Sequence, residues 1–261
     1  MQPTAEGTRE HTVRKRAEQE RYERQAAVGR GMGPSGSDFF HPALRGPYLF
    51  VEDWLRGRCQ GATLLDYGSG QGIHSVAPAK YGGDVVQLDI SPASLLAGAH
   101  RARQESVLSR CRPVAGDCER LPFEDATFDI IISSGTFSCL DLQAACSELV
   151  RVLKPEGHLI AVDTLGHNPL LNARRRLRGV RGERTRWEVE HVLRLQDLET
   201  MKRFFRCAEI HHFDLLTLAC TFRPFERLLP LARKIDRCLL RTPLFRPFAF
   251  KFVAILSEPR S

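Results

Sequence analysis

A glycine-rich loop directly after a short apolar segment limits the folds open to this chain more than any other feature. Residues 64–72 read LLDYGSGQG, so an apolar run meets an acidic residue and then glycines at alternate positions, Gly68, Gly70 and Gly72. Glycine permits positive φ and lets a ligand approach the main chain without meeting a Cβ. A strand that turns in this way into a helix, expected from about residue 73, forms a nucleotide-sized pocket at the carboxyl edge of a parallel sheet.

The spacing of these glycines differs from the dinucleotide-binding fingerprint. That fingerprint is G-x-G-x-x-G, and its third glycine packs the helix onto the strand. In this chain Gly72 comes one residue early and Ile73 stands at the third position. The loop therefore favours a nucleotide-type ligand, while the spacing weakens an NAD(P) or FAD interpretation without excluding it.

Two acidic residues farther along the chain extend this pattern. Residues 85–90 read VVQLDI, which predicts a buried strand that ends in Asp89. An acid at that strand end can accept hydrogen bonds from both hydroxyls of a ribose. Asp117 follows in the sequence GDCERLPF, and a carboxylate there can accept a hydrogen bond from the exocyclic amine of adenine. The ordered set of loop and two acids indicates an adenosine site.

Residues 62–163 resemble the core of the class I S-adenosylmethionine-dependent methyltransferases. Residues 121–129 (LPFEDATFD) are similar to the family's LPF-x-D-x-x-FD block, and residues 149–159 (LVRVLKPEGHL) to its RVLKPGG block, with Glu156 replacing the first glycine. Ser69 replaces a cysteine that is usual in the glycine loop. The resemblance implies S-adenosyl-L-methionine as cofactor. The implied cofactor-binding residues are Asp66, Gly68, Ser69, Gly70, Gly72, Asp89, Ile90, Asp117, Cys118 and Ser134.

The order of predicted strands and helices gives the same fold class. Apolar residues at helical spacing over 142–153 predict an amphipathic helix, which Pro155 and Gly157 end before a buried strand at 158–163. Such alternation is typical of a parallel α/β sheet. We expect a Rossmann-like, doubly wound, seven-stranded sheet with helices on both faces. Strands at 212–218 and 249–256 resemble the last two of the methyltransferase fold, whose final strand is antiparallel.

The ends of the chain differ in character from its middle. Residues 1–36 are charged and carry no apolar stripe, so we expect a flexible tail in preference to a solvated helix. The resemblance implies that residues 37–261 form one methyltransferase domain with a cofactor-binding core at about 62–163. The predicted acceptor-side elements are 37–57, 164–200 and 221–247.

Two basic segments leave alternatives open. The net charge is +7, and part of it lies in an arginine cluster between Arg174 and Arg186. That cluster suits an acidic acceptor, RNA contact or a solvated helix face. Residues 221–247 mix leucine and phenylalanine with arginine, a pattern found in helices that cover a sheet and in helices that lie on a membrane surface.

The cysteines and the N-terminus point to a reducing compartment. No C-x-x-C pair occurs, so reduced thiols are preferred over disulfides or a metal site. The eight cysteines are Cys59, Cys111, Cys118, Cys139, Cys146, Cys207, Cys220 and Cys238. The polar start resembles no signal peptide and no apolar run is long enough to span a bilayer, so we expect a cytoplasmic protein.

Methyl transfer from a sulfonium is an in-line displacement that needs alignment, and it needs a base only for a hydroxyl or a protonated amine. His167, after the fifth strand, and His41, before the first, are the candidate bases. Neither an Asn/Asp-Pro-Pro-Tyr/Phe signature nor a Pro-Cys nucleophile is present. We therefore expect a small-molecule methyltransferase, with an acidic or lipid-like acceptor and O-methylation preferred. The alternatives are an RNA methyltransferase using the 174–186 cluster and a non-catalytic module that binds adenosine or a partner.

Overall fold

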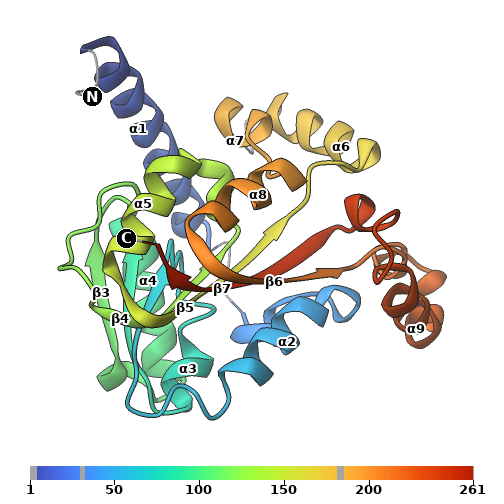
Figure 1. Ribbon diagram of the computed structural model, residues 1–261, viewed down its shortest axis with the longest axis horizontal. Helices are drawn as coiled ribbons and strands as arrows, with labels where there is room; N and C mark the ends of the chain where they lie inside the picture. Colours follow the sequence, from blue (N-terminus) through green and yellow to red (C-terminus); the bar gives the residue numbers. More distant parts are fainter. Residues whose placement is uncertain (1–4, 30–32, 181–184, 261) are drawn as a thin grey trace.

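The computed structural model describes residues 5–29, 33–180 and 185–260 and contains one seven-stranded sheet (Figure 1). The strand order is β3-β2-β1-β4-β5-β7-β6, the first five strands are parallel, and β7 is antiparallel to both of its neighbours. This confirms the predicted doubly wound sheet with an antiparallel last strand. The strands are β1 (Thr63–Tyr67), β2 (Asp84–Asp89), β3 (Cys111–Ala115), β4 (Phe128–Ser134), β5 (Leu153–Thr164), β6 (Phe205–Phe213) and β7 (Lys251–Pro259).

Helices cover both faces of the sheet, and each face has its own apolar core. On one face α2 (Gly46–Leu55), α3 (Val76–Lys80) and α4 (Pro92–Gln104) pack against the strands. On the other face lie α5 (Leu142–Val152) and α8 (Leu195–Arg203). The remaining elements are α1 (Ala5–Ala27), η1 (Gly36–Phe39), η2 (Pro42–Leu44), η3 (Leu108–Arg110), η4 (Phe137–Cys139), α6 (Pro169–Val180), α7 (Arg186–Glu190), η5 (Ala219–Thr221), η6 (Phe225–Leu228), α9 (Leu229–Leu239) and η7 (Arg246–Phe248).

Helix α5 shows how the sequence pattern becomes packing. Its buried positions, Ala145, Cys146, Leu149 and Val152, recur at helical spacing and face the sheet. The Asp141 side chain caps its start by accepting a hydrogen bond from the Ala144 backbone N–H at 2.9 Å. The chain leaves α5 directly into β5 at Leu153, so the strand begins earlier than the expected residue 158 and includes Pro155 and Gly157.

The expected strand at residues 212–218 is wrong in its position. Strand β6 ends at Phe213, and the next residue, Asp214, has a positive φ of 63°. The buried Asp236 carboxylate accepts backbone N–H bonds from Leu215, Leu216 and Thr217 at 2.8–3.1 Å. These bonds satisfy N–H groups that a longer strand would have paired, and so they turn the chain toward α9.

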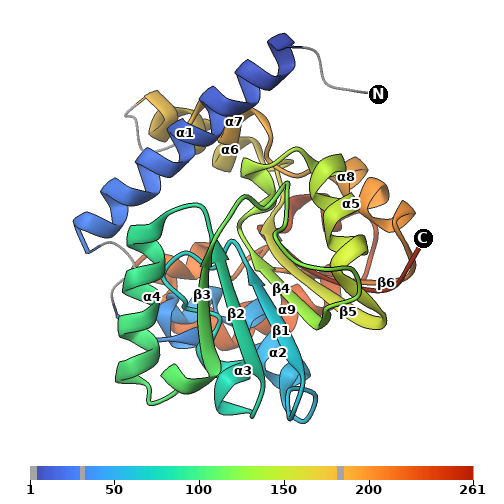
Figure 2. The same ribbon diagram turned by 90° about the vertical axis from the view of Figure 1, so that its left-hand side faces the viewer.

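The expectation of a flexible tail over residues 1–36 differs from the structure, because Ala5–Ala27 form helix α1. Figure 2 shows α1 lying across one end of the sheet, between α4 and the pair α6 and α7. It packs through charged contacts instead of an apolar stripe, so hydrophobic periodicity gave no sign of it. Within the described residues, no helix has the length and apolar character needed to cross a membrane.

Candidate functional site

A cavity of about 350 Å³ opens at the carboxyl edge of the sheet, where β1, β2 and β4 end. Its walls come from the glycine loop, the segments after β2, β3 and β4, helix α1, the stretch from η1 to α2, and the first residue of β7. Eight of the ten residues predicted to bind a cofactor line it: Gly68, Ser69, Gly70, Asp89, Ile90, Asp117, Cys118 and Ser134. The loop and both predicted acids therefore meet at one cavity.

The glycine loop keeps one stretch of main chain open to this cavity. A Cβ at Gly68 (φ +69°) would come within 2.4 Å of the Thr136 side chain, whereas one at Gly70 (φ +51°) would meet nothing within 4 Å. Beside them, the buried hydroxyl of Ser69 has no hydrogen-bond partner among the described residues. A bare backbone next to an unpaired donor is what a ligand in close contact with the loop would need.

Asp89 ties the loop to the end of β2. Its carboxylate accepts backbone N–H bonds from Gly70 at 2.8 Å and from Ser91 at 2.9 Å. Burial raises the pKa of Asp89, and these two N–H groups act against the rise. The side chain borders the cavity with lone pairs left over, so it can accept further hydrogen bonds from a ligand hydroxyl.

Helix α1 closes the cavity over the second acid. Lys15 of α1 donates to the Asp117 carboxylate at 2.6 Å, and the Glu119 backbone N–H donates to the same oxygen at 2.9 Å. Arg14 pairs with Glu119 next to it. The carboxylate that is predicted to meet adenine therefore also anchors the helix that covers it.

The two remaining predicted residues, Asp66 and Gly72, lie behind the cavity wall. Gly72 packs against Gln87 and Gly98. Asp66 is buried, and Ser75 Oγ donates to it at 2.5 Å while Gln87 Nε2 donates to Ser75 Oγ at 2.9 Å. Both residues shape the glycine loop from below, without contributing to the cavity surface.

Burial of Asp66 predicts a pH-dependent stability. Desolvation raises the pKa of its carboxyl from 3.8 to about 7. A raised pKa stabilises the fold at low pH, and this contribution is lost as the pH rises through about 7. Between about pH 4 and pH 7, the free energy of unfolding of the wild-type protein should therefore fall by a few kcal/mol relative to that of Asp66→Asn.

Urea unfolding of both proteins across this pH range measures the difference. The comparison cancels the titration of Asp214, a second buried carboxyl whose pKa burial raises to about 7. A constant difference in the free energy of unfolding across the range would contradict the prediction.

The cavity also has an aromatic wall. The rings of Phe40 and Tyr48 stack with centroids 3.6 Å apart, and the His74 ring lies 5.3 Å from Tyr48 and 5.8 Å from Phe40. Phe39 completes this wall, at an edge-on 5.2 Å from Phe40. Burial lowers the pKa of His74 to about 4, with Lys251 and Arg101 acting in the same direction, so its imidazole is neutral at pH 7.

Sequence reasoning missed Lys251, the first residue of β7, which reaches the cavity from the far end of the chain. Burial acts to lower its pKa, but Tyr48, Asp163 and Asp214 outweigh burial and raise the pKa above its ordinary value. The ammonium lies 5.2 Å from the centre of the Tyr48 ring. The signal in the sequence that could have indicated it is a lysine at the start of an otherwise apolar strand.

The two histidines proposed as bases do not line the cavity. His41 is exposed, and its Nδ1 accepts the Ala43 backbone N–H at 3.2 Å. His167 Nε2 accepts the Leu195 backbone N–H at 3.0 Å, at the start of α8. Both imidazoles are therefore used to cap helices, whereas His74, which was not among the predicted bases, lines the cavity.

The arginine cluster between Arg174 and Arg186 does not present one continuous basic face in the described residues. Arg175 is buried and donates to the Leu165 carbonyl at 3.3 Å, and the exposed Arg186 pairs with Glu190 at 2.8 Å. Arg176 is exposed. The side chains of Arg174, Arg178, Arg181 and Arg184 lie outside the described part of the structure.

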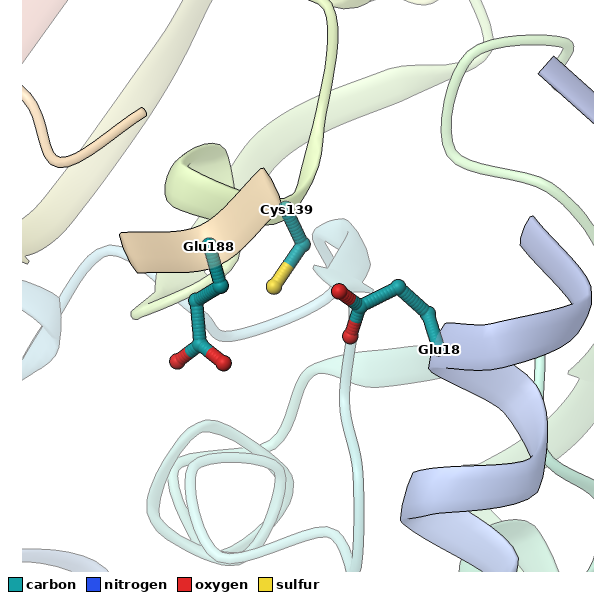
Figure 3. A group of neighbouring side chains, drawn as sticks. All are labelled: Glu18, Cys139 and Glu188. Carbon is teal, nitrogen blue, oxygen red and sulfur yellow. The ribbon is translucent and has the colours of Figure 1, made fainter. Parts of the chain in front are cut away.

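Helices α1 and α7 meet at a buried group formed by Glu18, Cys139 and Glu188 (Figure 3). These side chains have the chemistry of metal ligands, with donor atoms within 4.8 Å of one another. Arg21 donates to both carboxylates, and Thr185 donates to Glu18. Because the Arg21 guanidinium already supplies a cation to both carboxylates, we interpret the cluster as an ionic contact that holds α1 over the cavity, in preference to a metal site.

Part of the chain is similar to known methyltransferases. Residues 65–161 match a family model described as a methyltransferase domain. The chain is 32% identical over 110 residues to the sterol 4-C-methyltransferase strm-1 of Caenorhabditis elegans, covering 42% of this chain and 33% of that protein. It is 38% identical over 104 residues to a demethylmenaquinone methyltransferase of Mycolicibacterium paratuberculosis, covering 40% of this chain and 42% of that protein. The matched region thus spans less than half of either relative.

A solved structure shares the fold over most of the chain. The geranyl diphosphate C-methyltransferase of Streptomyces coelicolor A3(2), in complex with Mg²⁺, geranyl diphosphate and S-adenosyl-L-homocysteine, superposes with a TM-score of 0.56. The match covers 80% of each chain at 17% sequence identity, a likeness that concerns the fold alone.

Proposed function

Since the chain, through residues 65–161, belongs to the class I S-adenosylmethionine-dependent methyltransferases, we propose that it transfers a methyl group from S-adenosyl-L-methionine to a small, mainly apolar acceptor. The observation that carries this proposal is the single cavity that joins the glycine loop, Asp89 and Asp117 to an aromatic wall. The acids suit one end of an adenosine, and the wall suits an acceptor.

The residues present fit this cofactor. The open backbone at Gly70 and the unpaired Ser69 hydroxyl suit the amino-acid portion, while Asp89 suits the ribose hydroxyls and Asp117 the adenine amine. When bound, the cofactor supplies an electrophilic methyl group on a positively charged sulfur. The protein contributes by holding the acceptor in line with that group and by excluding water, and such alignment is worth roughly 7–11 kcal/mol in well-oriented systems.

The aromatic wall favours a planar or hydrocarbon acceptor. Phe39, Phe40 and Tyr48 offer apolar surface, and the charged Lys251 can bind an anionic group on the acceptor. Neutral His74, beside the aromatic wall, can accept a proton or a hydrogen bond from an acceptor hydroxyl, so we transfer to it the role predicted for His167 and His41. The names of the similar proteins, which are sterol, demethylmenaquinone and geranyl diphosphate methyltransferases, support an apolar acceptor.

Two acceptor atoms are candidates. The sequence pattern favours oxygen, and it is the first choice because a neutral imidazole beside an apolar wall suits an aromatic or enolic hydroxyl. Carbon is the second choice, supported by the names of two relatives that are C-methyltransferases. The mass spectrum and NMR spectrum of the methylated product distinguish the two.

Incubation with methyl-labelled S-adenosylmethionine and fractionated cell extract tests the proposal. We expect label in an organic-soluble small molecule, and a fall in transfer rate of about 100-fold for His74→Asn, because a positioned proton acceptor contributes about that much. His41→Asn, a change of the same kind at an exposed position, should retain activity. Label in RNA would favour the alternative that uses the 174–186 cluster, and cofactor binding without any transfer would favour the non-catalytic alternative.

A further inference from the structure

The segment 216–248, beyond the edge strand β6, exposes more large apolar side chains for its length than the rest of the described chain. Figure 1 shows α9, at the centre of this segment, at one end of the long axis, away from α1. Eight of the fifteen exposed large apolar side chains in the described part of the chain lie in these 33 residues. They are Leu216, Phe222, Phe225, Leu228, Leu231, Ile235, Leu244 and Phe248.

Part of this surface forms a stripe on helix α9. Leu228, the N-cap residue of α9, is followed by Leu231 and Ile235 at i+3 and i+7. The three side chains therefore lie along one side of the helix, and each is exposed. The buried positions of α9, Ala232 and Asp236, lie on a neighbouring side that faces the protein. The apolar stripe therefore does not contribute to the buried core of the protein.

The same segment is strongly basic. It carries seven arginine or lysine side chains and two carboxylates, one of which, Asp236, is buried and bound to backbone N–H groups. None of the seven forms a salt bridge with a carboxylate within the described residues. They are Arg223, Arg227, Arg233, Lys234, Arg237, Arg241 and Arg246.

Four of these arginines also border a second cavity, of about 680 Å³, between α9, α2 and β6. Its walls include the apolar side chains of Leu49, Phe50 and Leu240. A hollow with an apolar wall and guanidinium groups around it suits an anionic headgroup attached to a hydrocarbon chain.

We propose that residues 216–248 dock the protein on the surface of an anionic lipid bilayer. The apolar stripe would enter the boundary between headgroups and acyl chains, while the surrounding arginines contact the acidic headgroups. A second copy of this chain fits this surface less well. In a symmetric dimer the segment would face its own copy, and its seven cations would meet a surface whose one exposed carboxylate is Glu226. The docking is independent of methyl transfer, and it would bring the protein to the phase in which an apolar acceptor dissolves.

Co-sedimentation of the full chain with lipid vesicles, without cofactor, tests this inference. We expect binding to vesicles of phosphatidylcholine with phosphatidylglycerol, and much weaker binding to phosphatidylcholine alone. The triple variant Leu228→Ser, Leu231→Ser, Ile235→Ser should lose binding by more than about tenfold. Arg233→Gln with Arg237→Gln should weaken binding to the acidic vesicles by about fivefold for each arginine.

The control is Leu96→Ser on α4, which removes a leucine more exposed (64%) than any of the three stripe residues from another helix and should not affect binding. Thermal unfolding of each variant checks that it is folded. Equal binding to neutral and acidic vesicles, or triple-variant binding equal to that of the wild type, would overturn the proposal. So would a wild-type dimer that the triple variant converts to a monomer in the absence of lipid, since a second copy would then cover the stripe.

Discussion

The Asp89→Ala variant is expected to lose affinity for S-adenosylmethionine by at least about 100-fold, because two charge-assisted hydrogen bonds to ribose hydroxyls are each worth about 1.5–3 kcal/mol. The same change removes the acceptor of the Gly70 backbone N–H, so the glycine loop also loses its tie to β2. Isothermal titration calorimetry with the cofactor and with its demethylated product measures the loss. Thermal unfolding without ligand separates it from a general loss of stability.

The chain provides a matched control for this change. Asp84 is the same residue type at the opposite end of β2, where it is 68% exposed and pairs with Arg110 at 3.0 Å. Asp84→Ala should bind the cofactor as the wild type does. Undiminished binding by Asp89→Ala would place the ribose elsewhere, and heat with a nicotinamide or flavin dinucleotide but none with the sulfonium would reject the cofactor assignment.

The Arg21→Ala variant is expected to release helix α1 from the cavity. Arg21 is the cation shared by Glu18 and Glu188, and all three are buried. Removing one partner of a buried ionic group leaves uncompensated charge and typically costs about 3–5 kcal/mol. Because α1 is held mainly by such contacts and has no apolar stripe, this cost falls on the docking of α1 more than on the sheet.

Amide hydrogen exchange measures the release. Residues of α1 should exchange much faster in Arg21→Ala, while amides of β1 and β4 keep their protection, and cofactor should dissociate faster from the opened cavity. Arg16→Ala is the control, since Arg16 is 81% exposed and pairs with Glu20 on the outer side of the same helix. Unchanged exchange in α1 of Arg21→Ala would show that other contacts hold this helix.

The central sheet and the cofactor side of the cavity could be predicted because their signals are local. Each strand end carries its own residues, Gly68 after β1, Asp89 at the end of β2 and Asp117 after β3. In a parallel sheet the carboxyl ends meet at one edge, so the order along the chain already implies that these residues are close in space. The strand at 212–218 failed because its end depends on Asp236, which lies about 20 residues away.

The identity of the candidate base could not be predicted from local sequence patterns. His41, His74 and His167 each lie near the carboxyl edge in sequence terms, and side-chain direction decides among them. In the structure His41 and His167 accept backbone N–H bonds at the starts of helices, and His74 turns toward the aromatic rings. Hydropathy and spacing carry no information on such rotations, because they depend on which neighbours pack around each side chain.

The sequence by itself determined the fold class, the glycine loop and the acids at the strand ends, since backbone conformation and strand alternation are written in neighbouring residues. Only the tertiary structure decided that α1 covers the cavity, that Lys251 enters it from the last strand and that segment 216–248 leaves an apolar stripe exposed. The physical reason is the separation along the chain between the residues that make these contacts. These features rest on ion pairs and packing between residues far apart in the chain, and the free energy of such contacts depends on distance in space, which no local pattern records.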